Sequence, residues 1–364
     1  MTQQSIMRAK FKIDLQLMIP VIVLVSLSLV TLLSINPIFF QSQLVSLIIA
    51  TIAFLIFSQV NTDFLKQFKV PIYVLSIIIL CITLAIGIES RGATRWIDIF
   101  GVRLQFSEIL KPFLAIAFAT WVAENKHTTF RTFLLTMLFL APIFLLVQFQ
   151  PDLGSAILYG STVVFALMIS GYPFKWFAIL ATPFILLSPV IWTFLEGYQR
   201  QRILTFLNPT ADPLGISYNS IQAMIAVGSG HFLGKGLSEG TQSGLRFLPE
   251  RQTDFIFATI AEGLGFFGAL IIVLTIIFLC YRIFLIFSRT NDAFIRVFAA
   301  CTFGIILIPS FVNIGMNIGI VPIVGVTLPF VSFGGSSLLS NFIFLGLLSS
   351  MSTSQKHKDV LEIR

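Results

Sequence analysis

Four ionisable residues of this chain lie beside or within long apolar stretches, where a charge is costly. Glu108 and Lys111 are three positions apart, so they share one face of a helix. Asp254 directly precedes the apolar run Phe255–Phe257, and Glu262 follows eight residues later, about two helical turns on. Because ionisable groups at such depth are functional candidates by default, we expect a proton acceptor and a counter-charge among them.

Glu108, Asp254 and a third carboxylate, Asp152, each also have a plain structural explanation. Glu108 and Lys111 can neutralise each other as an ion pair, or they can line a polar cavity. Asp254 can cap the helix that follows it, or it can accept a proton in a reaction. Asp152 lies in the short turn Gln150–Gly154, where it can both cap a helix and face a cavity. Residue type and spacing leave these alternatives open.

Several arginines stand in the polar segments between the apolar runs. Arg95 is followed by Trp96, which is either an interfacial aromatic residue or a substrate contact. Arg202 and Arg246 belong to the longest polar segment. Guanidinium groups bind phosphate oxygens well, so Arg95, Arg202 and Arg246 are candidates for holding a phosphorylated substrate.

Small and polar residues mark the last two apolar runs. Gly334 and Gly335 permit close helix approach, and the following Ser336 can satisfy backbone groups or contact a substrate. Asn313 and Asn317 are four positions apart and can join neighbouring helices by hydrogen bonds. Tight packing alone also explains this pattern.

The elements that must position these residues are apolar helices. Of 364 residues, 56% are hydrophobic and 11% are charged, whereas about 25% charged is usual in soluble domains. A spanning helix needs about 20 mostly apolar residues. We therefore predict an all-α integral membrane protein, a single polytopic domain over 1–364 with about ten transmembrane helices. The expected helices cover 15–35, 38–59, 70–88, 107–123, 132–149, 153–171, 174–195, 256–281, 295–319 and 329–350.

The distribution of Lys and Arg predicts which side each segment faces. Most of the 23 basic residues fall on one side if the N-terminus is cytoplasmic, and an even number of spans then puts both termini there. The first span is expected to be retained, because it is too long for a signal peptide and no small-residue cleavage site follows. Acidic residues lean to the opposite side, which suggests that the chemistry takes place there.

The segment 196–255 becomes a large extracytoplasmic loop between the seventh and eighth helices. Within it, Tyr218–Val227 has apolar residues at helical spacing. We expect an amphipathic helix that lies at the membrane interface or dips into the bilayer, and the sequence leaves open whether 218–232 is re-entrant.

Other classes of function are disfavoured. The net charge is +7, but the basic residues are scattered rather than gathered in a nucleic-acid-binding motif. The three cysteines have no metal-ligand spacing and the three histidines are far apart. We predict no metal site and no required cofactor, although a divalent cation could accompany a phosphorylated substrate.

Five segments together resemble the SEDS family (shape, elongation, division and sporulation) over nearly the whole chain. The elongation branch, RodA, is more similar than the division branch, FtsW. Gly263, where the family usually has a second glutamate, and Phe106, where proline is common, are the visible departures. The matching segments are Gln105–Lys111, Gln150–Gly154, Gly234–Gly236, Phe247–Ala258 and Leu328–Ser337.

The resemblance implies a peptidoglycan glycosyltransferase in the bacterial inner membrane, polymerising lipid II on the outer face for cell elongation and shape. It also implies a complex with a class B penicillin-binding protein, a transpeptidase. Asp254 matches the essential catalytic carboxylate, Glu108 and Lys111 match central-cavity positions, and Arg95 and Trp96 match sensitive outer-loop positions.

The implied reaction joins a sugar hydroxyl to the anomeric carbon of a second sugar in a single inverting displacement. It requires one base for the hydroxyl and positive charge for the departing polyprenyl diphosphate. We assign Asp254 as the base, with Lys111, Arg202, Arg95 and Arg246 as unranked candidates for the diphosphate. A lipid II flippase or transporter, and a non-catalytic scaffold, are the rival hypotheses. The full set of expected substrate-binding residues is Glu108, Lys111, Arg95, Trp96, Asp152, Arg202, Arg246, Glu262 and Ser336.

Overall fold

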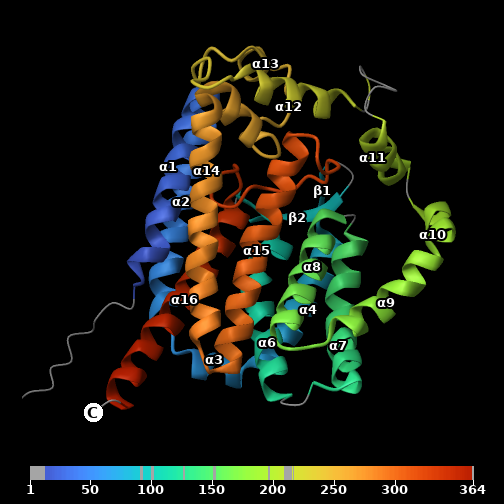
Figure 1. Ribbon diagram of the computed structural model, residues 1–364, viewed down its shortest axis with the longest axis vertical. Helices are drawn as coiled ribbons and strands as arrows, with labels where there is room; N and C mark the ends of the chain where they lie inside the picture. The colour runs from blue at the N-terminus through green and yellow to red at the C-terminus, as the bar shows by residue number, and fades with distance from the viewer. Residues whose placement is uncertain are drawn as a thin grey trace, which may run out of the picture.

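The computed structural model describes residues 13–90, 93–99, 102–125, 128–150, 153–195, 197–208, 215 and 217–362. They form a bundle of long helices with a layer of short elements at one end (Figure 1). The first half contains α1 (Leu15–Ile35), α2 (Pro37–Gln59), α3 (Thr62–Gln67), α4 (Lys69–Ile86), β1 (Ile88–Ser90), β2 (Ala93–Ile99), β3 (Val102–Leu104), α5 (Phe106–Ile109), α6 (Lys111–Glu124), α7 (Phe130–Phe149) and α8 (Leu153–Ile169). The second half contains α9 (Phe174–Leu186), α10 (Ser188–Phe194), α11 (Gly197–Leu207), α12 (Tyr218–Ser229), α13 (Thr241–Gly244), α14 (Ile256–Arg289), α15 (Ala293–Asn317) and α16 (Gly335–Glu362).

The long helices form because their apolar side chains face lipid or each other while each backbone satisfies its own hydrogen bonds. Polar caps fix where several of them begin. The side chains of Asp14, Asn36 and Asp292 accept hydrogen bonds at the starts of α1, α2 and α15. Thr129 and Thr132 form a reciprocal capping box at the start of α7.

A helix occupies each of the ten predicted windows, but not all of them qualify as spans. Eight of the described helices are long and apolar enough to cross a membrane, or up to nine if a bent pair counts as one span. That pair is α9 and α10, which meet at 62°. The described part of α8 is shorter than each of those eight helices, so the count of ten stays a prediction. The predicted helical membrane architecture is confirmed, with three short strands in addition.

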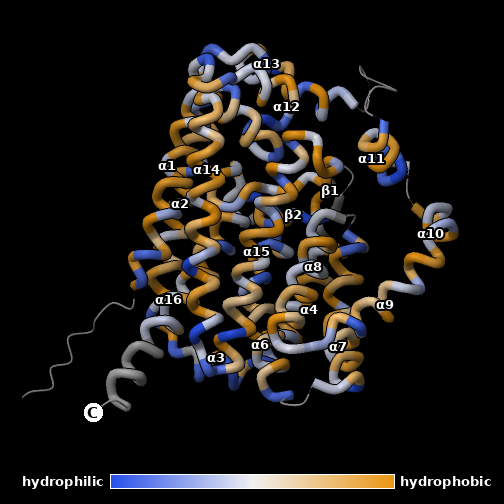
Figure 2. The backbone as a smooth tube through the Cα atoms, viewed as in Figure 1, coloured by the Kyte–Doolittle hydropathy of each residue, from blue (hydrophilic) through white to orange (hydrophobic). Residues whose placement is uncertain are grey.

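Two ends of the bundle can be told apart in Figure 1. The upper face carries α12 and α13, and the lower face carries α3 together with the C-terminal end of α16. Hydrophobic residues dominate the bundle between the faces, and hydrophilic residues gather at both ends (Figure 2). This two-ended polarity is what a bilayer-spanning body requires.

The segment that contains the outer-loop positions Arg95 and Trp96 belongs to a small sheet. Its strand order is β1-β2-β3, with both pairs antiparallel. Ile88 pairs with Trp96, and Asp98 pairs with Arg103. The sheet lies near the upper part of the bundle, beside the upper ends of the neighbouring helices (Figure 1).

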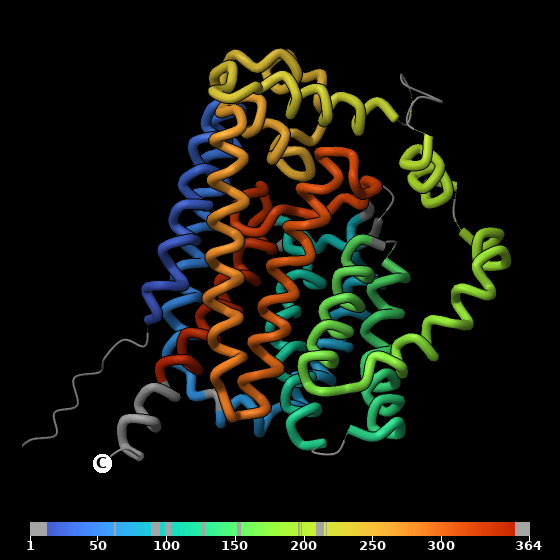
Figure 3. The backbone as a smooth tube through the Cα atoms, viewed as in Figure 1, coloured from blue at the N-terminus to red at the C-terminus, as the bar shows by residue number. Residues whose placement is uncertain are grey.

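The core lies where α1, α2, α6, α14, α15 and α16 meet. Its largest fully buried side chains include Phe294, Phe298 and Phe344. By contrast, α9 and α10 diverge from the bundle in Figure 3, and no residue of α10 is buried. Their bend lies between Pro183 and Pro189, where the helical hydrogen-bond ladder is interrupted.

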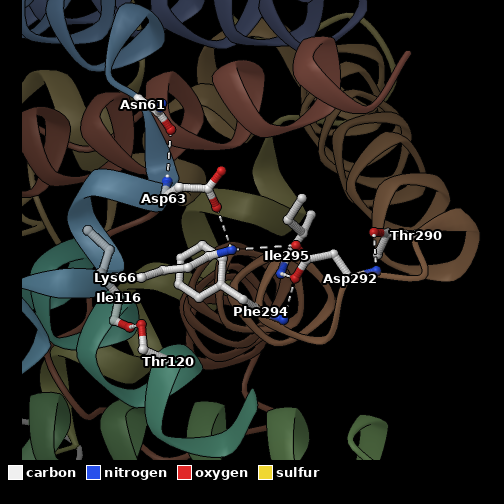
Figure 4. A network of polar contacts seen from close by, with 9 residues as sticks. All are labelled: Asn61, Asp63, Lys66, Ile116, Thr120, Thr290, Asp292, Phe294 and Ile295. Atoms are coloured by element: carbon white, nitrogen blue, oxygen red, sulfur yellow. Dashed lines mark hydrogen bonds and ion pairs between the residues drawn. The ribbon is translucent and has the colours of Figure 1, made fainter. Parts of the chain in front are cut away.

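A network of charged and polar side chains lies at the lower face (Figure 4). Lys66 on α3 lies 2.9 Å from Asp63 and 3.5 Å from Asp292, and its ammonium group sits 4.6 Å from the ring centroid of Phe294. Asp292 also caps α15. The α14–α15 turn is thereby tied to α3.

The upper layer is docked on α14 at a break in that helix. Gly265 has φ 67° and ψ −160°, so the backbone leaves helical geometry there. The freed groups pair with the preceding loop: Phe266 N–H donates to the His231 carbonyl at 2.8 Å, and Gly236 N–H donates to the Gly263 carbonyl at 2.9 Å. The predicted end of this helix near residue 281 was too early, because apolar sequence continues to Arg289.

Replacing Gly234 by alanine should destabilise this junction. Gly234 has φ +81°, and a Cβ there would lie 2.2 Å from the Gly263 carbonyl oxygen. We expect a loss of about 2 kcal/mol or more of unfolding free energy, seen as a lower apparent Tm in detergent.

Gly228→Ala is the matched control, because nothing lies within 4 Å of a Cβ at this exposed helical position. It should raise stability by about 0.5–1 kcal/mol. Equal Tm values for the two variants would contradict the close approach at Gly234.

Candidate active site

Asp254 lies at the head of α14 and faces the segment between α15 and α16. We call residues 324–334 of this segment the strap. A Cβ built on Gly325 would lie 3.5 Å from Oδ2 of Asp254, so the carboxylate borders the strap directly. The Ser332 hydroxyl donates to the Thr253 carbonyl at 2.7 Å, and Phe333 N–H donates to the Gln252 carbonyl at 2.9 Å. The carboxylate is therefore held between two well-anchored stretches of chain.

Two buried asparagines hold the main chain at this position. Asn313 Nδ2 and Asn317 Nδ2 donate to the Asp254 carbonyl at 3.0 and 3.1 Å. Asn313 Nδ2 also donates to the Val326 carbonyl at 2.7 Å. The sequence pattern marks this pair only as polar residues between helices; the structure gives it a specific partner.

One arginine contacts the strap, and two more closely precede Asp254 in the chain. Arg202 on α11 donates to the Val324 carbonyl of the strap at 3.2 Å. Arg246 is exposed in a turn where its φ is +64°. Burial, reinforced by the nearby charge of Arg246, lowers the pKa of Arg251 below the usual arginine value. The sequence interpretation named Arg202 and Arg246 but gave Arg251 no binding role.

Glu108 and Lys111 form a second polar centre inside the bundle. Lys111 Nζ lies 2.5 Å from Oε1 of Glu108, and the two side chains are only 6% and 13% exposed. The ammonium group also lies 5.8 Å from the ring centroid of Tyr159. The hydroxyl of Tyr159 donates to the Ser107 carbonyl, so α8 supports this turn.

A largely apolar cavity of about 350 Å³ begins at Lys111. It lies among α6, α7, α8, α9, α15 and α16, and Tyr159 and Thr162 are among its few polar neighbours. Asp254 does not line it. Representative apolar lining residues are Leu114, Phe118, Leu140, Phe144, Leu180 and Phe184.

Hydrogen bonds of the residues that follow the strap connect the Glu108–Lys111 turn to the segment that borders Asp254. Gln105 N–H donates to the Ser336 hydroxyl at 3.0 Å, and Gln105 Nε2 donates to the Ser107 hydroxyl at 3.1 Å. Ser337 and Thr327 hydroxyls are 3.3 Å apart. The Glu108 turn and Asp254 therefore border opposite ends of one connected segment, and Ser336 joins that segment to the turn.

Glu262 is fully buried and already carries several hydrogen bonds. Its Oε1 accepts from Gln242 N–H at 2.9 Å, and its Oε2 accepts from Ser243 N–H at 2.8 Å and from the Ser243 hydroxyl at 2.7 Å. Lys235 Nζ lies 3.9 Å from Oε1. This carboxylate fastens α13 to α14, a role that helical spacing relative to Asp254 does not reveal.

Two of the remaining predicted residues are on β2, and one lies outside the described part. Arg95 and Trp96 are half-buried on β2. Asp152 lies outside the described residues, although its neighbour Gln150 is fully buried and donates through Nε2 to the Leu80 carbonyl at 3.2 Å. Over the described residues, no group of three or more His, Cys, Asp and Glu is placed to hold a metal ion.

A family model described as cell cycle protein, which covers FtsW, RodA and SpoVE, matches residues 8–357. The chain belongs to this family of polytopic membrane proteins. It is 42% identical over 288 residues to the peptidoglycan glycosyltransferase MrdB of Escherichia coli, covering 78% of each chain. It is 37% identical over 283 residues to a probable peptidoglycan glycosyltransferase FtsW of Idiomarina loihiensis, covering 75% of this chain and 68% of that one.

Solved structures share the fold. One, from a study of how a peptidoglycan synthase complex coordinates polymerization and crosslinking, has a TM-score of 0.81 at 27% identity and covers 93% of this chain and 97% of that one. The crystal structure of the rod shape determining protein RodA of Thermus thermophilus has a TM-score of 0.71 at 24% identity, covering 93% and 96%. Apolar helices and this kinship identify a bacterial inner membrane protein.

Replacing Glu262 by glutamine should loosen the upper layer. The new amide group would present N–H donors to the donors of Gln242 and Ser243, leaving buried groups without partners. We expect the docking of α13 to weaken by about 1–3 kcal/mol. Hydrogen–deuterium exchange of peptides covering 238–248 should become faster.

Glu239→Gln is the control, because Glu239 is exposed in the same loop. Its exchange should match that of the unmodified protein. Unchanged exchange in Glu262→Gln would mean that the carboxylate does not fasten α13.

Proposed function

We propose that this protein is an inverting glycosyltransferase that polymerises lipid II into glycan strands on the outer face of the membrane, for cell elongation and shape. The observation that carries the proposal is the carboxylate of Asp254, held at the head of α14 against the strap. Kinship with proteins named peptidoglycan glycosyltransferase supplies the reaction class.

Asp254 is assigned as the general base. Polymerisation joins a sugar hydroxyl to the anomeric carbon of a second sugar, and the polyprenyl diphosphate departs from the opposite side. The hydroxyl must lose its proton as the new bond forms, and a carboxylate positioned within hydrogen-bond reach can take it. Asp254 is half-buried, and its neighbour Phe255 packs against α12 of the upper face, a setting that suits a substrate whose sugars lie outside the hydrocarbon.

Cations that contact the strap or precede Asp254 in the chain suit the departing diphosphate. Arg202 reaches the strap from α11, while Arg246 and Arg251 precede Asp254 in the chain. Arg95 and Trp96 on β2, Glu108, Lys111, Asp152, Glu262 and Ser336 complete the proposed substrate-binding set. Within it, the hydrogen bonds of Glu262 and Ser336 favour support of the site over direct contact.

The cavity beside Lys111 suits the prenyl part of the substrate. Its walls are almost entirely apolar, and its polar end is the Glu108–Lys111 pair. A lipid chain lying there would keep its hydrocarbon out of water while its head group remains near charge.

The proposed topology puts the lower face in the cytoplasm and both termini with it. Lys66, Lys69, Arg289 and Arg296 are in or beside the turns of that face, as a cytoplasmic face requires. A class B penicillin-binding protein is the proposed partner, supported by the likeness to a structure of a peptidoglycan synthase complex. A lipid II flippase is not favoured, because the named relatives are glycosyltransferases.

Replacing Asp254 by asparagine should abolish polymerisation, because the amide cannot accept the proton. The rate should fall by at least about 100-fold. The test uses purified protein with its partner and lipid II in detergent, where no membrane remains to be crossed, and glycan products are separated by size.

Glu250→Gln is a matched control: it also removes a carboxylate, four residues earlier in the same motif. Retained strand formation by folded Asp254→Asn would remove Asp254 as base. No strands from the unmodified protein would instead support transport or scaffolding.

Replacing Lys111 by alanine should lower polymerisation by about 100-fold, because it removes a preorganised positive charge from a site shielded from water. Lys69→Ala on the lower face should leave the rate unchanged, since Lys69 pairs with Glu124 far from the strap. Full activity of folded Lys111→Ala would show that the pair with Glu108 is structural.

A further inference from the structure

The start of α14 is unusual in how its first hydrogen bonds are made. Regular pairing begins with Thr259 N–H, which donates to the Phe255 carbonyl at 3.0 Å. Phe255 occupies the N-cap position and makes no side-chain cap hydrogen bond. The N–H groups of a first helical turn lack partners within their own helix, so they must find them elsewhere.

Asn317 supplies that partner from a neighbouring helix. Its Oδ1 accepts from Ala258 N–H at 3.2 Å, and its Nδ2 donates to the Asp254 carbonyl at 3.1 Å. In an unbroken helix these two backbone groups would bond to each other, because residue 258 pairs with residue 254. Asn317 thus fills the place of one helical hydrogen bond and keeps Asp254 outside α14.

Asn313 fixes the same carbonyl to the strap. Its Nδ2 group donates to the Asp254 carbonyl at 3.0 Å and to the Val326 carbonyl at 2.7 Å. Val326 adjoins Gly325, the residue that faces the carboxylate of Asp254. One amide group therefore links the backbone of Asp254 to the chain that borders its side chain.

The two asparagines also hold each other. Asn317 Nδ2 donates to the Asn313 carbonyl at 2.7 Å, and both side chains are 0% exposed. An aspartate of the same shape could not donate these bonds when ionised, and a smaller side chain would leave the Ala258 N–H group free to pair with Asp254. The Asn317 amide donates two of these bonds and accepts a third, and a single hydroxyl cannot donate twice.

We propose that Asn313 and Asn317 are positioning residues for glycosyl transfer. They prevent α14 from extending by one residue, and so hold the carboxylate of Asp254 against the strap. This inference rests on the proposed role of Asp254 as base. Both asparagines act on the main chain of Asp254, through its carbonyl.

The test compares Asn317→Ala, Asn317→Asp and Asn313→Ser with the unmodified protein. Each is assayed as full-length chain with its partner and lipid II in detergent. Displacement of the base should lower kcat by about 100-fold while KM for lipid II changes by less than about threefold. Asn313→Ser retains one hydroxyl donor and should lose less than either variant of Asn317.

Thr302→Val is the matched control. It removes a buried hydroxyl from the same helix, and that hydroxyl bonds only to the Phe298 carbonyl at 2.9 Å. The control should lower the apparent Tm without lowering kcat. A general loss of stability would affect both sets of variants alike, whereas a positioning role affects kcat only at Asn313 and Asn317.

Asp254→Asn, run beside these variants, separates the two hypotheses. If it is inactive while Asn317→Ala and Asn317→Asp keep full kcat, positioning is overturned and the base assignment stands. If Asp254→Asn keeps its activity, the base assignment fails first. Should Asn317→Ala not fold, kcat of the milder Asn313→Ser variant decides: full kcat overturns the proposal, and a lower kcat with unchanged KM supports it.

Discussion

Hydrocarbon offers no hydrogen-bond partners, so the polar groups of this bundle must find theirs within the chain. Regular helices meet the constraint by themselves. The constraint is more informative at the two breaks of α14, because backbone groups freed there are paired with residues distant in sequence. At the head of α14 the partners are Asn313 and Asn317, and at Gly265 they are N–H and carbonyl groups of the preceding loop.

This constraint links the site to its surroundings. Asp254 is bound through its main chain to α15, and its neighbours Thr253 and Gln252 are bound to the strap. The strap continues into Ser336, which receives the N–H group of Gln105 just before the Glu108–Lys111 turn. Asp254, Arg202 and the Glu108–Lys111 turn come from three distant parts of the sequence and thus border a single connected segment.

Local sequence patterns predicted the bundle well and the contacts between its parts poorly. Long apolar runs identified the helices because lipid exposure and helical pairing are local requirements. The sheet around Trp96, the break at Gly265 and the partners of Asn317 depend on segments far apart in the chain, which no window of residues contains. Glu262 shows the same limit: its spacing from Asp254 suggested a shared face, but Gln242 and Ser243 claim its oxygens.

The break in α14 has a consequence for how the protein meets membranes of different thickness. After Gly265 the helix continues unbroken from Phe266 to Arg289, which is longer than the roughly 20 residues that cross a bilayer, so it tilts or projects where the hydrocarbon layer is thin. Gly265 separates this long part from a short first part, Ile256–Leu264, which is bound to the upper layer. Because the short part has its own hydrogen bonds to the upper layer, a tilt of the long part that bends at Gly265 leaves the head of α14 in place.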